Sequence, residues 1–407
     1  MTGPIDAATV AALADEPLDW RFKGLPASWW GRTPAQICAA APNPIDEGAV
    51  GPLCVLRARA LTHNLTTMGH WCRDRGVELA PHGKTHMAPQ LLARQLEAGS
   101  CAVTVATISQ ARAYRAFGVR DFILANELVD AAGLHWVAAE CDADPGFTLM
   151  CWVDSLRGIE VMTSTLADTG AMRPLDVCVE VGMTGGRTGC RGQDSVDEVA
   201  RAAAASPKLR LVGVAGYEAA RGHDVGPDAL ADVRAYLAEV RAAMVRLAPL
   251  FETDSAVVTA GGSTYFDVVA DVLAGDWRTI LRSGCYLTHD EGLYARTSPL
   301  RDGLRPALSV WAQVLSRPEP GLALVGMGRR DVSFDQDLPM PYGLSASHVA
   351  KLNDQHAYLV LGGDDRADVG DWIEFGISHP CTVFDKWQMI PVLDDDGRVV
   401  DLVRTFF

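Results

Sequence analysis

The chain has 407 residues, 48% of them hydrophobic, and its 36 basic and 51 acidic side chains leave a net charge of −15. This length and hydrophobicity allow a large buried core and favour one large domain with a smaller one. Acidic charge that is spread without long runs argues against nucleic acid or an anionic membrane as a partner. The ten cysteines include no CxxC pair, which is typical of reduced, buried thiols. Because neither a signal-peptide pattern nor a long apolar span is found, we expect a cytoplasmic protein.

The first segment, residues 1–50, begins with a helical stretch and continues through Trp29-Trp30 into a proline-rich connection. It is too short to form a core of its own. We therefore expect it to pack on another part of the chain.

Residues 51–298 alternate short aliphatic runs with alanine-rich helical patterns, which is the signature of βα units. Eight strand runs with helical crossovers predict a (β/α)8 barrel. An open doubly wound sheet is the alternative, although no GxGxxG follows an early strand. The predicted strands are 77–81, 102–107, 121–125, 147–153, 175–181, 211–217, 256–259 and 279–282, and the predicted helices are 88–98, 109–117, 131–141, 156–168, 195–205, 227–248 and 264–274.

Lys84 stands where the first of these strands ends, in the stretch Pro81-His82-Gly83-Lys84-Thr85-His86. Ligands meet a βα barrel at the carboxyl ends of its strands. A poorly solvated amine at that place suits a Schiff-base nucleophile. Gly83 permits close backbone approach, and His82 and His86 flank the amine. A surface lysine on a loop is the alternative for Lys84.

Two glycine-rich turns follow the seventh and eighth strands, Gly261-Gly262-Ser263-Thr264 and Ser283-Gly284-Cys285-Tyr286. Such turns expose backbone N–H groups, and phosphate sites of βα barrels commonly lie after these two strands. The alternative is that the glycines only permit tight turns. A phosphate site opposite a lysine on the first strand is what pyridoxal 5'-phosphate requires.

Arg187 lies in the loop Gly185-Gly186-Arg187-Thr188-Gly189. A guanidinium is suited to planar pairs of oxygens, so Arg187 can reach the ring oxygen of the cofactor or a substrate carboxylate. A salt bridge at the barrel rim explains it equally well.

Residues 299–407 show closely spaced strand patterns without helical crossovers, which predicts an antiparallel β domain. After the run Trp372–Gly376 comes Ser378-His379-Pro380-Cys381. Residues two apart in an extended segment face the same way, so His379 and Cys381 can share one metal ion. Imidazole with thiolate favours zinc, and two protein ligands leave an open site. A structural histidine beside a buried cysteine is the alternative.

With these motifs in order, the chain from about residue 50 onward resembles the fold-type III pyridoxal-phosphate enzymes of the D-serine dehydratase and D-threonine aldolase group. These enzymes combine an alanine-racemase-like barrel with a C-terminal β domain. The resemblance is carried by the Lys84 segment and by 181–189, 331–335 and 379–385.

The resemblance implies a role for each matching position. Lys84 would carry the cofactor and act as the base at Cα, Arg187 would contact the ring oxygen, and Tyr217 would lie near the pyridine nitrogen. The phosphate would be held by Gly262, Ser263, Gly284, Cys285 and Tyr286, with His82 a further cofactor contact. Zinc, or manganese or another divalent ion, would be held by His379 and Cys381. A homodimer is expected, with part of each site coming from the other subunit.

Within this group, the dehydratases carry His-x-Cys where the aldolases carry His-x-Asp. Cys381 therefore favours a zinc-dependent dehydratase that deaminates D-serine or a related β-hydroxy D-amino acid to a 2-oxo acid and ammonia. The alternative on the same scaffold is an aldolase that cleaves D-threonine or 3-hydroxy-D-aspartate to glycine and an aldehyde. A non-catalytic pyridoxal-phosphate-binding protein would share only the barrel, so residues 299–407 count against it. Met87 departs from the lysine that many members have, and His289, Asp290 and Tyr294 after the eighth strand are further candidates.

Overall fold

The computed structural model describes residues 4–407, and its contacts divide them into two compact units. The barrel unit contains the described residues through Asp6, Gly69–Lys84 and Gln95–Gly284. The sheet unit contains Ala7–Met68, Thr85–Arg94 and Cys285–Phe407. This division differs from the expected boundaries at residues 51 and 299, because 7–68 and 85–94 belong with the C-terminal residues.

The barrel unit is built on an eight-stranded parallel sheet in the order β2-β9-β8-β7-β6-β5-β4-β3. The two ends of this order also meet, since His82 bridges to Thr104 in parallel and the Cys101 N–H donates to the Leu79 carbonyl at 2.9 Å. The predicted (β/α)8 fold is confirmed. The strands are β2 (Glu78–Leu79), β3 (Val103–Val105), β4 (Asp121–Glu127), β5 (Thr148–Val153), β6 (Leu175–Val181), β7 (Leu209–Gly216), β8 (Val257–Ala260) and β9 (Arg278–Leu281).

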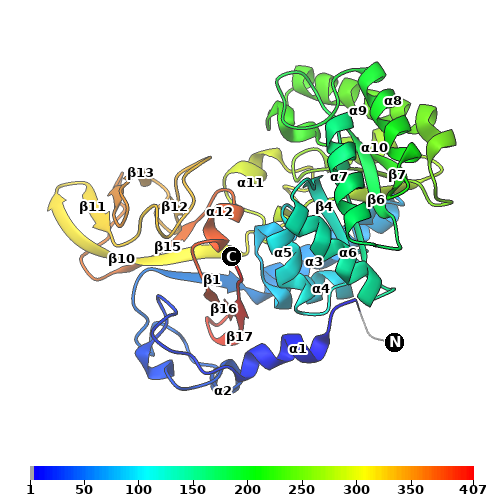
Figure 1. Ribbon diagram of the computed structural model, residues 1–407. Helices are drawn as coiled ribbons and strands as arrows, with labels where there is room; N and C mark the ends of the chain where they lie inside the picture. Colours follow the sequence, from blue (N-terminus) through cyan, green and yellow to red (C-terminus); the bar gives the residue numbers. More distant parts are fainter. Residues whose placement is uncertain (1–3) are drawn as a thin grey trace. The chain divides into compact units, whose positions relative to one another are not determined.

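Helices follow the strands, and successive ones from α6 to α10 pack side by side along the sheet (Figure 1). Several begin at a side chain that accepts a backbone N–H of the first turn, as the caps Thr107, Asp130 and Ser155 do. Each cap fixes the residue at which the loop ends and the helix begins. The helices are α5 (Ile108–Arg115), α6 (Ala131–Ala143), α7 (Leu156–Asp168), α8 (Gln193–Ala205), α9 (Pro227–Leu247) and α10 (Phe266–Leu273), with the 3-10 turns η4 (Glu218–Arg221) and η5 (Ala248–Leu250).

Side chains from alternate strand positions fill the interior of the barrel. They form one buried apolar cluster below the carboxyl ends of the strands. The buried members of the cluster are Ala80, Ile123, Met150, Trp152, Cys178, Val212, Ala215, Val257 and Ile280.

The sheet unit contains a nine-stranded, mostly antiparallel sheet in the order β13-β14-β11-β10-β1-β16-β17, with β15 pairing with both β10 and β12. The predicted C-terminal antiparallel domain is confirmed. The strands are β1 (Leu53–Arg57), β10 (Leu308–Glu319), β11 (Leu322–Val325), β12 (Met340–Pro341), β13 (His348–Leu352), β14 (Ala357–Val360), β15 (Trp372–Gly376), β16 (Met389–Leu393) and β17 (Val399–Arg404).

Strand β1 lies between β10 and β16, although it comes more than two hundred residues earlier in the chain than either. Successive side chains of β1 point to opposite faces of the sheet. Leu53 and Val55 join Trp29 and Ile37 in one cluster, whereas Cys54 and Leu56 join another. The N-terminal segment thus covers one face of this sheet.

The remaining elements are short or lie at the division between the units, which falls within α3 and α4. Among the described residues, no helix is both long and apolar enough to cross a membrane. These elements are α1 (Ala7–Ala11), η1 (Ala12–Asp15), η2 (Ala27–Trp29), α2 (Pro34–Ala40), α3 (Ala58–Asp74), η3 (Gly83–Thr85), α4 (Pro89–Glu97), η6 (Cys285–Leu287), α11 (Leu293–Thr297) and α12 (Cys381–Phe384).

Candidate active site

Lys84 lies in the single turn η3, directly after β2, and its side chain is half-buried. Gly83 packs so closely that an added Cβ would lie 2.6 Å from the Tyr114 ring and 2.8 Å from Val103. The Tyr114 hydroxyl also donates to the Gly83 carbonyl at 2.8 Å. Within residues 4–407, no hydrogen bond or ion pair engages the Lys84 amine. The turn is therefore fixed while its amine stays available.

His82, two residues earlier, has a buried Nδ1 without a hydrogen-bond partner among the described residues. Burial, and then the positive charges of Lys84 and Arg282, hold the pKa of His82 well below its usual range. The imidazole is consequently neutral. A neutral ring with a free nitrogen can accept a hydrogen bond from a bound group.

Arg187 is exposed on the loop after β6, and its guanidinium carbon lies 4.4 Å from the centroid of the Tyr217 ring. The structure thus brings these two predicted cofactor contacts together. Arg191 supports the loop, because its guanidinium donates to the Thr188 carbonyl at 2.9 Å. A small cavity between β6 and η4 is lined by residues that include Glu180, Arg187, Tyr217 and Tyr236.

The turn after β8 contains a contact that the sequence did not indicate. The N–H groups of Gly261 and Gly262 donate to the fully buried Glu218 carboxylate, at 3.0 and 2.7 Å. Ser283 donates to the carbonyls of both glycines, at 3.2 and 3.1 Å. The Gly262 amide is thus already engaged, and a phosphate contact from it stays a prediction, as it does for Ser263.

Gly284 ends the barrel unit, whereas Cys285 and Tyr286 begin η6 in the sheet unit. Both side chains of this pair are buried. The second predicted phosphate turn therefore continues from one unit into the other along the chain, and its role also stays a prediction.

Three carboxylates near the ends of β4, β5 and β6 were not predicted as site residues. Burial, followed by the charges of Glu180 and Asp154, raises the pKa of Glu127 to about 8. One oxygen each of Glu127 and Glu180 is buried without a partner among the described residues. The sequence signal that could have identified them is a charged residue at the end of a strand whose other residues are apolar.

Arg282, in the same unit, is buried. Its guanidinium donates to the Thr259 hydroxyl and the Gly216 carbonyl, both at 2.7 Å. It also lies 5.4 Å from the Trp152 ring. Burial lowers its pKa below the ordinary value, although Glu218 and Glu180 oppose this effect.

In the sheet unit, His379 follows β15 with a left-handed φ of 64°. Its N–H donates to Asp290 at 2.9 Å, and its Nδ1 lies 2.5 Å from Asp335 Oδ2. The other Asp335 oxygen accepts a hydrogen bond from the Thr382 hydroxyl at 2.8 Å. A carboxylate on Nδ1 leaves Nε2 as the nitrogen for a metal, which is the usual arrangement of metal-binding histidines.

Cys381 Sγ lies 3.3 Å from Cys285 Sγ and 3.4 Å from the Thr85 hydroxyl. The hydrogen bond with Cys285, and next that with His379, hold the pKa of Cys381 well below its usual range, against the effect of burial. Burial alone would lower the pKa of His379, but Cys381 and Asp335 raise it to about 9. His379 and Cys381 are thus in contact, but not for the expected reason: His379 is left-handed, Pro380 is helical and Cys381 begins α12, so the segment is not extended, and a shared metal ion stays a prediction.

The described residues contain no group of three or more His, Cys, Asp or Glu side chains that could hold a metal ion. The predicted site has two protein donors, His379 and Cys381, and an imidazole with a thiolate fits zinc. Asp290 accepts three N–H groups of its own loop besides that of His379. It therefore positions the donor segment and is itself engaged.

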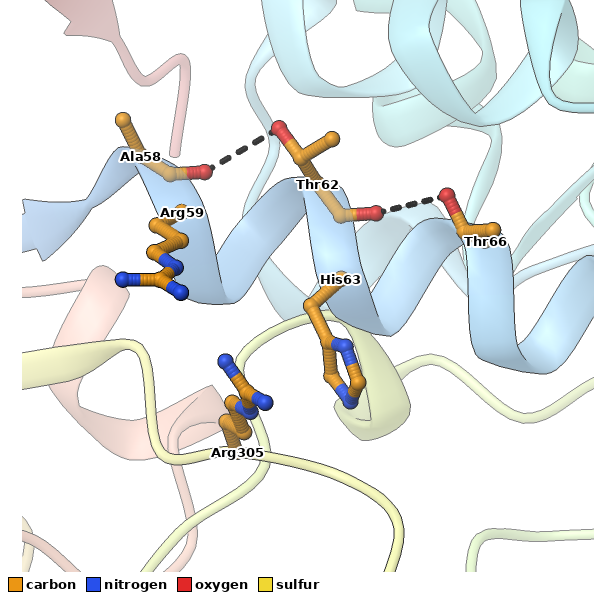
Figure 2. A pocket seen from close by; sticks show the side chains of 6 residues that line it. All are labelled: Ala58, Arg59, Thr62, His63, Thr66 and Arg305. Carbon is orange, nitrogen blue, oxygen red and sulfur yellow. Dashed lines mark hydrogen bonds between the residues drawn. The ribbon is translucent and has the colours of Figure 1, made fainter.

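Cavities occur away from these residues as well. One of about 590 Å³ in the sheet unit lies along α3, with Arg59, His63 and Arg305 among its lining residues (Figure 2). Another of about 330 Å³ in the barrel unit is lined by residues that include Gly186, Asp224 and Tyr265. None of the predicted site residues lines either one.

Two protein-family models match this chain. Residues 56–289 match the family model "Alanine racemase, N-terminal domain", and residues 307–393 match "Putative serine dehydratase domain". The chain belongs to the alanine racemase N-terminal domain family. Pyridoxal phosphate is the cofactor expected for this family, and the available Lys84 amine, the unpartnered His82 nitrogen and the stacked Arg187 fit it.

The chain is similar to lyases over most of its length. It is 28% identical over 359 residues to 3-hydroxy-D-aspartate aldolase of Paracoccus denitrificans (strain Pd 1222), with 84% of this chain and 89% of the relative covered. It is 26% identical over 376 residues to D-threo-3-hydroxyaspartate dehydratase of Delftia sp. (strain HT23), with 86% and 95% covered. The crystal structure of D-threonine aldolase from Filomicrobium marinum matches with a TM-score of 0.76 at 26% identity, over 88% of this chain and 95% of that one.

Proposed function

We propose that the protein is a pyridoxal-phosphate-dependent lyase that cleaves a 3-hydroxy D-amino acid between Cα and Cβ. The observation that carries this proposal is Lys84, whose amine has no partner among residues 4–407 and which lies on a turn fixed by Gly83 and Tyr114. Aldolases of D-threonine and 3-hydroxy-D-aspartate among its relatives support the substrate class. This gives aldol cleavage precedence over the dehydration that Cys381 suggested.

When bound, pyridoxal phosphate supplies an electron sink for the negative charge that develops at Cα. Lys84 Nζ would hold the cofactor aldehyde and, as the base of the site, would deliver a proton to Cα. Lys84 Nζ would take the β-hydroxyl proton as the Cα–Cβ bond breaks, and glycine and an aldehyde are the products. A single base on one face would restrict the reaction to one configuration at Cα.

Arg187 and Tyr217 would position the cofactor ring through the guanidinium and the phenol ring. His82 is neutral because burial and the nearby cations lower its pKa, so it would accept a hydrogen bond without adding positive charge. His379 and Cys381 would hold a divalent metal, with zinc favoured by the thiolate. Such an ion supplies Lewis acidity for the β-hydroxyl. A solved structure of a variant of D-threo-3-hydroxyaspartate dehydratase is described as the metal-free form, which supports metal binding as a property to test here.

Dehydration of the same substrates is the second candidate. It is favoured by His379-Pro380-Cys381, which resembles the His-x-Cys of the dehydratases, and by the relative from Delftia. In this reaction Lys84 Nζ would remove the Cα proton, the β-hydroxyl would leave, and a 2-oxo acid and ammonia would form. D-serine is a possible substrate of this dehydration reaction.

A panel assay separates the candidates. The purified holoenzyme is incubated with D-threonine, 3-hydroxy-D-aspartate and D-serine, with the L-enantiomers as controls, and glycine, aldehyde, 2-oxo acid and ammonia are quantified. We expect glycine and aldehyde from a D-substrate. A 2-oxo acid with ammonia in equal amounts would establish dehydration instead, and turnover of the L-enantiomers alone would contradict both candidates.

The homodimer and the cytoplasmic location remain predictions from the sequence. Sedimentation velocity of the purified holoenzyme tests the first. The matched serine dehydratase domain at residues 307–393 supports an enzyme over a non-catalytic cofactor-binding protein, which was expected to share only the barrel.

A further inference from the structure

We propose that Cys285 and Cys381 are a modification site, at which a peroxide joins the two thiols in a reversible disulfide. Their sulfur atoms lie 3.3 Å apart in the sheet unit. A disulfide requires a separation of about 2.05 Å, so the two atoms need to approach by a little over 1 Å. All ten cysteines of the chain are free thiols in the structure.

Hydrogen bonds hold together the two segments that carry these thiols. Cys285 is the first residue of η6 and Cys381 the first of α12, and hydrogen bonds join the segment after η6 to the residues just before α12. The Asp290 carboxylate accepts the His379 N–H at 2.9 Å, and the Ser378 hydroxyl accepts the Leu293 N–H at 3.0 Å. Neither hydrogen bond involves a sulfur atom. Both can therefore persist when the thiols become a disulfide.

The two thiols differ in exposure, and this difference indicates which of them reacts first with the peroxide. Cys285 is 4% exposed and packs with Leu293 and Tyr294, whereas Cys381 is half-buried at the edge of that cluster. Cys381 is therefore the sulfur that a small peroxide reaches first. Cys285 is then the resolving thiol, already in contact with it.

The chemistry balances with hydrogen peroxide as the oxidant. The Cys381 sulfur attacks the peroxide, the O–O bond breaks, and a sulfenic acid and one water form. The Cys285 sulfur then attacks the sulfenic sulfur, the S–O bond breaks, and the hydroxyl leaves with the Cys285 proton as a second water. Two thiols are oxidised and one peroxide is reduced. Because the disulfide uses the Cys381 sulfur, it removes one of the two proposed metal donors.

The experiment uses the reduced chain of 407 residues after chelator treatment, because a bound metal would occupy the Cys381 sulfur. Hydrogen peroxide is added, remaining thiols are alkylated, and unreduced peptides are mapped by mass spectrometry. We expect a linked pair of peptides containing Cys285 and Cys381, loss of two titratable thiols, and recovery of both with dithiothreitol. Recovery of Cys285 in alkylated form while Cys381 is oxidised would overturn the proposal.

Variants sharpen the result. Cys285→Ser should abolish the linked pair and leave Cys381 as an oxygen acid, and Cys285→Ala serves if the serine variant is unstable. Cys38→Ser, at a half-buried thiol elsewhere in the same unit, should leave the linked pair unchanged. The readout is a mass and a thiol count. An absence of lyase turnover would therefore refute the proposed function without affecting this result.

Discussion

The two units hold their candidate site groups in opposite ways. In the barrel unit, the Lys84 amine and the His82 Nδ1 have no protein partner among the described residues, and Arg187 only stacks on Tyr217. In the sheet unit, His379 and Cys381 are tied to Asp290, Asp335, Cys285 and Thr85. The first arrangement suits groups that a large organic cofactor will engage, whereas the second suits donors that are oriented before a small ion arrives.

Substitution of the unengaged amine should give the largest effect. Lys84→Ala removes the proposed nucleophile and base, and we expect lyase turnover to fall by about a thousandfold or more. The variant should also lose the absorbance of covalently bound cofactor. Lys351→Ala, at an exposed lysine, is the matched control. Retention of both signals in Lys84→Ala would show that the barrel amine is not the site.

Substitution of Asp335, which is hydrogen-bonded to the proposed metal donor His379, should give an effect of intermediate size. Asp335→Asn keeps the shape of the side chain but weakens the hydrogen bond at His379 Nδ1, so metal affinity should fall by roughly 10- to 100-fold. Competition with a chromogenic chelator measures this affinity. Asp354→Asn, at an exposed ion pair with Arg330, should leave it unchanged. Equal affinities in the two variants would place the metal elsewhere.

Substitution of Glu291 measures how much a buried carboxylate lowers the stability of the sheet unit. Burial, and then the charge of Asp290, raises its pKa to about 8, and its Oε1 has no partner among residues 4–407. A raised carboxyl pKa contributes stability that is complete below the unfolded value of about 4.5 and is lost as pH rises through about 8. Glu291→Gln removes this loss. Its gain in unfolding free energy over the native chain should therefore grow with pH, to about 2 kcal/mol above pH 8.

Glu127 is the corresponding carboxyl in the barrel unit, with a pKa also raised to about 8 by burial and by Glu180. The sign is the same, so stability is lost between about 4.5 and about 8. Its half-exposed position allows solvent screening, and Glu127→Gln should gain only about 1 kcal/mol above pH 8. Denaturant titrations at pH 5 and pH 9 measure both variants. A gain at pH 5 that equals the gain at pH 9 would contradict the assigned pKa shifts.

Much of the barrel could be predicted because its information is local. Each of the eight predicted strands corresponds to one strand from β2 to β9, and the predicted helix 156–168 agrees with α7 at both ends, where Ser155 caps it. Strands β1, β12, β13 and β17 escaped prediction. Val399–Arg404 and Leu53–Arg57 are single short runs whose meaning depends on partners far away in the chain.

The sequence by itself determined the alternation of strands and helices and the position of Lys84 at a strand end. Those features depend on neighbours along the chain, where periodicity and turn chemistry act. Only the tertiary structure decided that Glu218 takes the amides of Gly261 and Gly262, that Asp335 engages His379, and that Cys285 meets Cys381. These contacts join residues that are forty or more positions apart, and a buried polar group finds its partner wherever the packed chain happens to place one.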